Sequence, residues 1–282
     1  MLTEIRDTKL HVDERGAADA PPLLFVHGGP GAGSYDFMAF QGDRLAERFR
    51  VIGVDQRGVQ QSAPLTGPVS EQDLIADYEA LREHLGIEQW AILGHSYGGR
   101  IALRYATTHP AAISKAVFEN PAWDMVLATD TLVGAALPLL PGVELPPHTG
   151  PMTKQLWDAR VAVVGQLGER RMEIYLGPDN RDLQLPGDTE IAAEYHGRSG
   201  QFADQITQSA SFAEPVLQYL AELAMPALLI KGEYDPVTSA EEIELFRSDV
   251  PDGTYYYAAG VGHFMHAEQA DLFTRLVSDF LS

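Results

Sequence analysis

The chain has no cysteine among its 282 residues. It therefore has no disulfide framework, no thiolate nucleophile and no zinc or iron–sulfur site held by cysteine. It is also poor in positive charge, with 20 Lys and Arg against 40 Asp and Glu and a formal net charge of −20. This imbalance argues against binding nucleic acid or an anionic membrane surface, because both would repel the chain. A cationic substrate is compatible with it but not required.

Long apolar runs are lacking as well. None approaches the roughly 18 apolar residues that a membrane-crossing helix needs. The longest candidate, residues 132–145, is interrupted by two glycines and two prolines. Residues 1–7 contain no basic stretch followed by an apolar one, so no signal peptide is expected. The sequence thus predicts a soluble cytoplasmic protein.

Short apolar runs of strand length are present, each followed by turn residues. They lie at 23–26, 51–54, 90–93, 116–118, 228–230 and 254–257. Continuous runs of this kind suit strands that are buried on both faces of a parallel sheet. Helical spacing of apolar residues appears between them, at 70–85, 100–109, 239–247 and 267–281. This alternation predicts an α/β fold with a mostly parallel, doubly wound sheet.

One long segment breaks the alternation. Residues 121–224 are helical in composition, carry Pro and Gly at intervals and show no clear strand run. The segment is far longer than a plain crossover loop. We therefore expect an inserted helical cap at 121–224 and a discontinuous core domain made of residues 1–120 and 225–282.

A G-x-S-x-G pattern at residues 94–98 carries the strongest chemical signal. It follows the apolar run at 90–93 and precedes a helical pattern, as in a strand–turn–helix nucleophile site. Such a turn holds the central serine in a strained conformation, and the flanking glycines avoid clashes with neighbouring backbone. The pattern predicts Ser96 as a nucleophile that needs an adjacent base.

Two later residues stand where the base and its partner are needed. Asp235 follows the apolar run at 228–230, and His263 follows the run at 254–257. The carboxyl ends of parallel strands meet at one edge of a sheet, where open α/β sheets place their sites. We expect His263 to move the serine proton and Asp235 to orient the imidazole.

Other residues of the same types keep alternatives open. His266 competes for the role of the base, and Glu233, Glu119 and Asp124 compete for the role of the acid. The nine histidines show no H-x-x-x-H or H-E-x-x-H arrangement, so neither a metal nor a cofactor is expected.

The glycine-rich loop at residues 27–31 is expected to complete the site. The N–H groups of Gly29 and Tyr97 are the predicted oxyanion hole, because a glycine lets a backbone N–H point at developing negative charge.

Four polar residues near these loops are predicted to be structural. His27 and His95 are expected to support the loops, and Asp55 and Arg57 to form an ion pair.

The sequences HGGPG at 27–31, DQRG at 55–58 and GHSYGG at 94–99 resemble the prolyl iminopeptidase family of the α/β-hydrolase superfamily. Tricorn-associated aminopeptidases are similar as well, and the resemblance covers residues 1–120 and 225–282. It implies an α/β-hydrolase fold and cleavage of an N-terminal residue, often proline, from small peptides through an acyl-enzyme. It also implies acidic cap residues that hold the α-amino group of the substrate.

The chain departs from this family in the cap. Residues 175–180 resemble a segment that carries a glutamate after Gly-Pro-Asn in aminopeptidase relatives, and here Asn180 takes that place. Asp179, Glu173, Glu194 and Glu214 are the candidate substitutes. A carboxylesterase or lactonase acting on small esters is therefore the alternative function, and a non-catalytic binding scaffold is a third.

Overall fold

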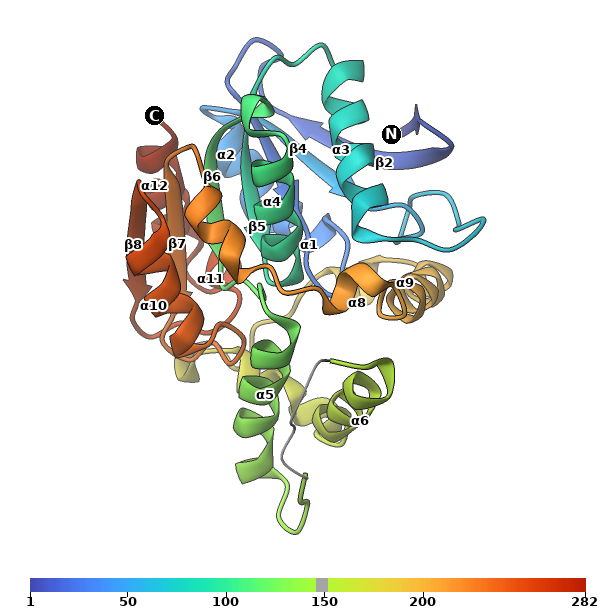
Figure 1. Ribbon diagram of the computed structural model, residues 1–282, viewed down its shortest axis with the longest axis vertical. Helices are drawn as coiled ribbons and strands as arrows, with labels where there is room; N and C mark the ends of the chain where they lie inside the picture. The colour runs from blue at the N-terminus through green and yellow to red at the C-terminus, as the bar shows by residue number, and fades with distance from the viewer. Residues whose placement is uncertain (146–151) are drawn as a thin grey trace.

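The computed structural model describes residues 1–145 and 152–282 (Figure 1). A single eight-stranded sheet runs through the molecule in the order β1-β2-β4-β3-β5-β6-β7-β8. The strands are β1 (Leu2–Ile5), β2 (Thr8–Arg15), β3 (Pro22–Val26), β4 (Arg50–Asp55), β5 (Trp90–His95), β6 (Ile113–Glu119), β7 (Ala227–Gly232) and β8 (Gly253–Ala258). All neighbouring pairs from β4 to β8 are parallel, whereas β1 and β2 are antiparallel. The predicted α/β fold with a mostly parallel sheet is confirmed.

Helices connect these strands. They are α1 (Tyr35–Phe37), α2 (Asp43–Ala46), α3 (Glu71–His84), α4 (Tyr97–Thr108), α5 (Met125–Ala136), α6 (Lys154–Gly165), α7 (Met172–Tyr175), α8 (Gly187–Glu190), α9 (Ala193–Ile206), α10 (Ala240–Asp249), α11 (Met265–Glu268) and α12 (Ala270–Leu281). Ser70 and Ser239 begin α3 and α10 with capping boxes, in which each serine accepts a backbone N–H and a downstream carboxylate returns the bond. The helix expected at 267–281 is divided into α11 and α12.

The sheet buries side chains on both faces. Along β3, Leu24 and Val26 belong to the apolar core that includes residues of α3 and α4. Leu23 and Phe25 belong to a second core on the opposite face, with residues of α12. Figure 1 shows α4 in front of the strands. Because successive residues of a strand point to opposite faces, continuous apolar runs are what such a doubly covered sheet requires.

The chain between β6 and β7 forms helices only, as far as residues 120–145 and 152–226 show. In Figure 1, α5 and α6 project beyond the end of the sheet. Residues 146–151 of the predicted cap lie outside the described residues. Within the described chain, no helix is both long enough and apolar enough to span a bilayer.

The antiparallel strands β1 and β2, of which β1 forms the edge of the sheet, were not expected from the sequence. In β2 only Leu10 and Val12 are buried, and the intervening residues are half-buried or exposed. An antiparallel edge that is covered on one face needs only every second residue to be apolar, so it produces no continuous apolar run.

The predicted ion pair between Asp55 and Arg57 is wrong. Arg57 donates to both carboxylate oxygens of Asp77, at 2.6 Å each, and to Asp7. Asp55 instead accepts from the backbone N–H and the hydroxyl of Ser34. Both residues are structural, but their partners come from other parts of the fold.

Candidate active site

Ser96 occupies the turn between β5 and α4. Its backbone has φ 55° and ψ −127°, a conformation that costs a non-glycine residue energy and persists only where the surroundings impose it. Here its N–H donates to the Glu119 carbonyl oxygen at 3.1 Å. Its own carbonyl oxygen accepts from the N–H groups of Gly99 and Ala122, at 2.8 and 2.9 Å. The strained turn is therefore fixed by three backbone hydrogen bonds.

The glycines of the motif let neighbouring backbone approach closely. A Cβ atom on Gly98 would collide with the carbonyl oxygens of Val26, the last residue of β3, and of His27, which follows it. A Cβ atom on Gly94 would lie 2.8 Å from the Ala102 Cβ atom in α4. Neither position has room for a side chain, so this local packing of strand against helix depends on glycine.

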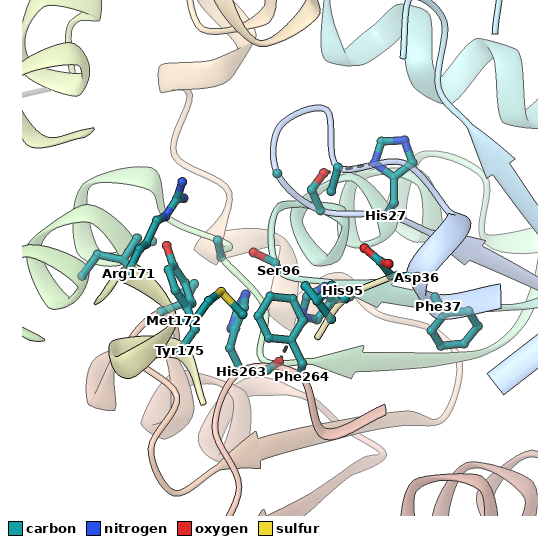
Figure 2. A pocket seen from close by; sticks show the side chains of 18 of the residues that line it. His27, Asp36, Phe37, His95, Ser96, Arg171, Met172, Tyr175, His263 and Phe264 are labelled. Atoms are coloured by element: carbon teal, nitrogen blue, oxygen red, sulfur yellow. Dashed lines mark hydrogen bonds between the residues drawn. The ribbon is translucent and has the colours of Figure 1, made fainter. Parts of the chain in front are cut away.

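A cavity of about 460 Å³ opens above this turn, and both Ser96 and His263 line it (Figure 2). Gly29, on the loop after β3, lines the same cavity and has φ 111°, which favours glycine. Tyr97 follows Ser96 as the first residue of α4. The two residues predicted for the oxyanion hole thus lie on the loop after β3 and at the start of α4.

Asp235 and His263 are joined by a hydrogen bond. The distance from His263 Nδ1 to Asp235 Oδ1 is 2.6 Å, and both side chains are buried. The Asp235 carboxylate also accepts from the N–H groups of Val237 and Thr238, at 3.1 and 3.0 Å. Lys231 Nζ lies 3.1 Å from Asp235 Oδ2. The carboxylate is thereby held in one orientation toward the imidazole.

Opposing effects act on the Asp235 carboxyl. Burial alone would raise its pKa, but the hydrogen bond and charge of His263 and the charge of Lys231 hold that pKa below the ordinary 3.8. The group is therefore ionised near neutral pH, as a partner for an imidazolium must be.

The competing residues have other partners. His266 Nδ1 lies 2.9 Å from Glu119 Oε2, which makes a second buried histidine–carboxylate pair. Asp124 caps α5 by accepting the N–H groups of Val126 and Leu127. Glu233 accepts the N–H of Gly260 at 2.8 Å. Only Asp235 contacts His263 among the acids considered from the sequence.

His27 and His95 bind backbone groups. His27 Nε2 accepts the N–H of Gln56 at 3.1 Å, and burial lowers the pKa of His27. His95 Nε2 lies 3.0 Å from the His263 carbonyl oxygen. Burial, together with the nearby His263 and His266, holds the pKa of His95 well below 6.5. These contacts match the expected support of the loops.

One buried group has the residue types of a metal site. His95, Glu119 and His266 offer ligand atoms within 4.8 Å of one another. Those atoms are engaged within the protein, because Glu119 pairs with His266 and His95 bonds to the backbone of His263. The hydrogen bonds account for this group without an ion.

The cap acids that the sequence suggested lie away from the cavity. Glu173 pairs with Arg170, Glu214 pairs with Arg104, and Asp179 and Glu194 are exposed. Among the described residues that line the cavity, the carboxylates are instead Asp36 and Glu169, which sequence reasoning missed.

Asn180 is also bonded within the protein, since its side-chain amide donates to Glu268 at 3.2 Å. No local sequence pattern marks Asp36 or Glu169, because only the tertiary fold brings these two carboxylates to the cavity.

Comparisons with known proteins identify the family and the fold. The family model of the alpha/beta hydrolase fold matches residues 21–270. A proline iminopeptidase from Neisseria meningitidis is 38% identical over 114 residues, which are 40% of this chain and 36% of that protein. A proline iminopeptidase from Arabidopsis thaliana is 36% identical over 113 residues, which are 39% of this chain and 29% of that protein. The matched part thus covers about a third of the length of these relatives.

Solved structures of the same fold cover the whole chain. A proline iminopeptidase-related protein from Thermus thermophilus superposes with a TM-score of 0.80 at 22% identity, over 100% of this chain and 96% of that one. An enol-lactonase from Burkholderia xenovorans superposes with a TM-score of 0.73 at 20% identity, over 100% of this chain and 99% of that one. At such identities the likeness shows the fold alone. With the family match across residues 21–270, the chain belongs to the alpha/beta hydrolase fold family and resembles prolyl iminopeptidases.

Proposed function

We propose that the protein is a serine hydrolase that acts through an acyl-enzyme, with Ser96, His263 and Asp235 as its triad. The observation that carries the proposal is the 2.6 Å hydrogen bond from His263 to Asp235 beside a strained serine that lines the same cavity. This is the arrangement that nucleophilic catalysis by serine needs.

In the proposed reaction, Ser96 Oγ attacks the substrate carbonyl carbon while His263 Nε2 takes the serine proton. The oxyanion accepts hydrogen bonds from the N–H groups of Gly29 and Tyr97. His263 then gives the proton to the leaving amine or alcohol, and the acyl group stays on Ser96. A water molecule, deprotonated by His263, attacks the acyl carbon, and the proton returns to Ser96 as the acid leaves. Asp235 stabilises the imidazolium in both steps.

The proposed substrate class is an N-terminal aminoacyl or prolyl amide in a small peptide. It is supported by the matched segments of proline iminopeptidases and by carboxylates at the cavity wall. Asp36 and Glu169 are the acids that a protonated α-amino group would meet there. Asp36 is already oriented, because its Oδ1 atom accepts the N–H of Gly187 at 2.7 Å.

A small ester or lactone is the second candidate. It is favoured by the position of the cap acids, since Glu173 and Glu214 pair with arginines and Asn180 bonds to Glu268. An ester substrate would not require an anchor for an amine.

We further propose that residues 121–224 form a cap distinct from a core of 1–120 and 225–282. The cytoplasmic location stays a prediction.

A substrate panel tests the proposal. We expect release of arylamine from prolyl and alanyl p-nitroanilides, and loss of that release when the substrate amine is acetylated. Asp36→Asn and Glu169→Gln should raise KM for the free amides and leave hydrolysis of p-nitrophenyl acetate unchanged. Turnover of the ester or of a lactone without any amide turnover would overturn the peptidase assignment in favour of the second candidate.

A further inference from the structure

The loop that carries His263, residues 260–264, packs directly on a segment of the predicted cap, residues 175–180. The N–H of His263 donates to the Tyr175 carbonyl oxygen at 2.6 Å. A Cβ atom on Gly262 would collide with that same oxygen, and a Cβ atom on Gly177 would collide with the Gly260 carbonyl oxygen. The two segments are therefore in backbone contact at positions where only glycine fits.

A single carboxylate, that of Glu268 at the end of α11, bonds to both segments. On the histidine side it accepts the N–H of Gly262 at 3.0 Å and the N–H of Phe264 at 3.1 Å. On the cap side it accepts the N–H of Gly177 at 2.7 Å and the side-chain amide of Asn180 at 3.2 Å. Bonds from N–H groups to an ionised carboxylate are stronger than neutral ones, so this is a firm junction.

The opposite side of His263 is held by the core. Its carbonyl oxygen accepts from Asn120 Nδ2 at 2.8 Å and contacts His95 Nε2 at 3.0 Å. Asn120 stands directly after β6 and also accepts the N–H of Gly232 at the end of β7. The core thus fixes the His263 carbonyl group, whereas the N–H groups on either side of the imidazole depend on Glu268.

We propose that Glu268 is a positioning residue for His263, and that it makes the geometry of proton transfer depend on the docking of residues 175–180. Glu268 accepts the N–H groups of both neighbours of His263 and, through its Oε2 atom, also holds the cap segment against them. Loss of this carboxylate releases the loop on its cap side while Asp235 and Ser96 stay in place. A displacement of about 1 Å at such a group costs on the order of 10²-fold in rate. The inference rests on the proposed triad.

Two variants test the carboxylate itself. Glu268→Ala is expected to slow covalent labelling by a fluorophosphonate on the order of 10²-fold. Its kcat for p-nitrophenyl acetate should fall by the same factor and its KM should change much less, because most residues that line the cavity lie outside the two released segments. Glu268→Gln keeps one acceptor oxygen and should lie between Ala and the wild type. Glu244→Ala removes an exposed carboxylate that pairs with Arg247 on the surface, and it is the matched control.

A third variant tests the docking while the Glu268 side chain is retained. Gly177 has an ordinary φ of −62°, so Gly177→Ala strains no backbone torsion. Its Cβ atom would collide with the Gly260 carbonyl oxygen and lie 3.1 Å from Glu268 Oε2, which pushes residues 175–180 away from the His263 loop. It should slow labelling as Glu268→Ala does. Gly165→Ala is the control, because a Cβ atom there meets nothing within 4 Å.

The readout separates positioning from mere stability. Rates are expressed per labelled molecule at the end point, and folding is followed by thermal unfolding. A lower Tm with an unchanged rate per active site in Glu268→Ala and Gly177→Ala would overturn the inference. If Ser96→Ala is still labelled or His263→Gln still turns over, the proposed triad fails instead.

Discussion

Two buried histidine–carboxylate pairs lie three residues apart along the chain and differ in what surrounds them. His263 Nδ1 lies 2.6 Å from Asp235, and His266 Nδ1 lies 2.9 Å from Glu119. The two acids follow or end neighbouring strands, β7 and β6, and both imidazoles line the same cavity. A histidine–carboxylate pair in a cavity is therefore not enough to identify a catalytic base.

The partners of each carboxylate separate the two pairs. Glu119 Oε1 also accepts the backbone N–H of His266 at 2.8 Å, and the Glu119 carbonyl oxygen accepts the N–H of Ser96. The His266 ring packs among aromatic rings, with centroids 5.5 Å from Phe37 and 6.1 Å from Phe273. This pair therefore fixes the serine turn and the start of α11. His263 instead lies on a loop that is held by Glu268 and by close backbone contacts at Gly262.

Replacing each histidine by glutamine gives the largest expected contrast. His263→Gln should lower kcat on the order of 10⁶-fold, because no other base then reaches the serine proton. His266→Gln should lower kcat less than tenfold, which is under about 1.4 kcal/mol of barrier, since glutamine can still donate to Glu119. The measurement is kcat for p-nitrophenyl acetate beside the rate of fluorophosphonate labelling.

The reverse result would break the comparison. A His266→Gln protein that is folded yet as inactive as His263→Gln would place both imidazoles in the proton path. Ser96→Ala serves as the inactive reference, and circular dichroism shows whether each variant has folded.

Replacing the two carboxylates by amides compares the two pairs again, with a smaller expected loss of kcat. Asp235→Asn should lower kcat on the order of 10⁴-fold, because the amide favours the wrong imidazole tautomer and carries no charge. Glu119→Gln should cost about 1–3 kcal/mol of unfolding free energy, as a buried partner of His266 is altered, with less than a tenfold change in kcat. Urea unfolding and kcat are measured on both. Full activity in Asp235→Asn would move the acid to Glu119 or another carboxylate.

The sequence predicted the residues of the proposed triad because each one follows an apolar run. Ser96, Asp235 and His263 stand just beyond β5, β7 and β8, and the ends of parallel strands meet at one edge of the sheet. The order of these residues along the chain and their positions at strand ends were therefore enough to predict that they lie close together. The half-exposed strands β1 and β2 gave no such run and were missed.

Pairings between side chains were less predictable. Arg57 binds Asp77 rather than its near neighbour Asp55, because α3 carries Asp77 against the loop after β4. The bonds from Glu268 to Gly177 likewise depend on how residues 175–180 fold back onto the core. Such contacts depend on tertiary placement and side-chain direction, which periodicity does not record.

The smallest expected effect concerns His95, which lies between the two pairs. Its ring centroid is 4.6 Å from that of His263 and 5.1 Å from that of His266. Because burial and the two neighbouring imidazoles hold the pKa of His95 well below 6.5, it stays neutral while the site works. His95 therefore separates the pairs and adds no charge to either.

His95→Gln should accordingly change the labelling rate less than tenfold and leave its pH dependence in place. Since the pKa of His95 is lowered, its charged form would appear only on acidification, below the range in which an ordinary histidine titrates. The carbonyl oxygen of His263 also keeps its bond from Asn120 in the variant. Labelling rates measured from roughly pH 5 to 9 check this. A shifted acid limb in His95→Gln would mean that the three imidazoles titrate together, and the two pairs would then have to be treated as one site.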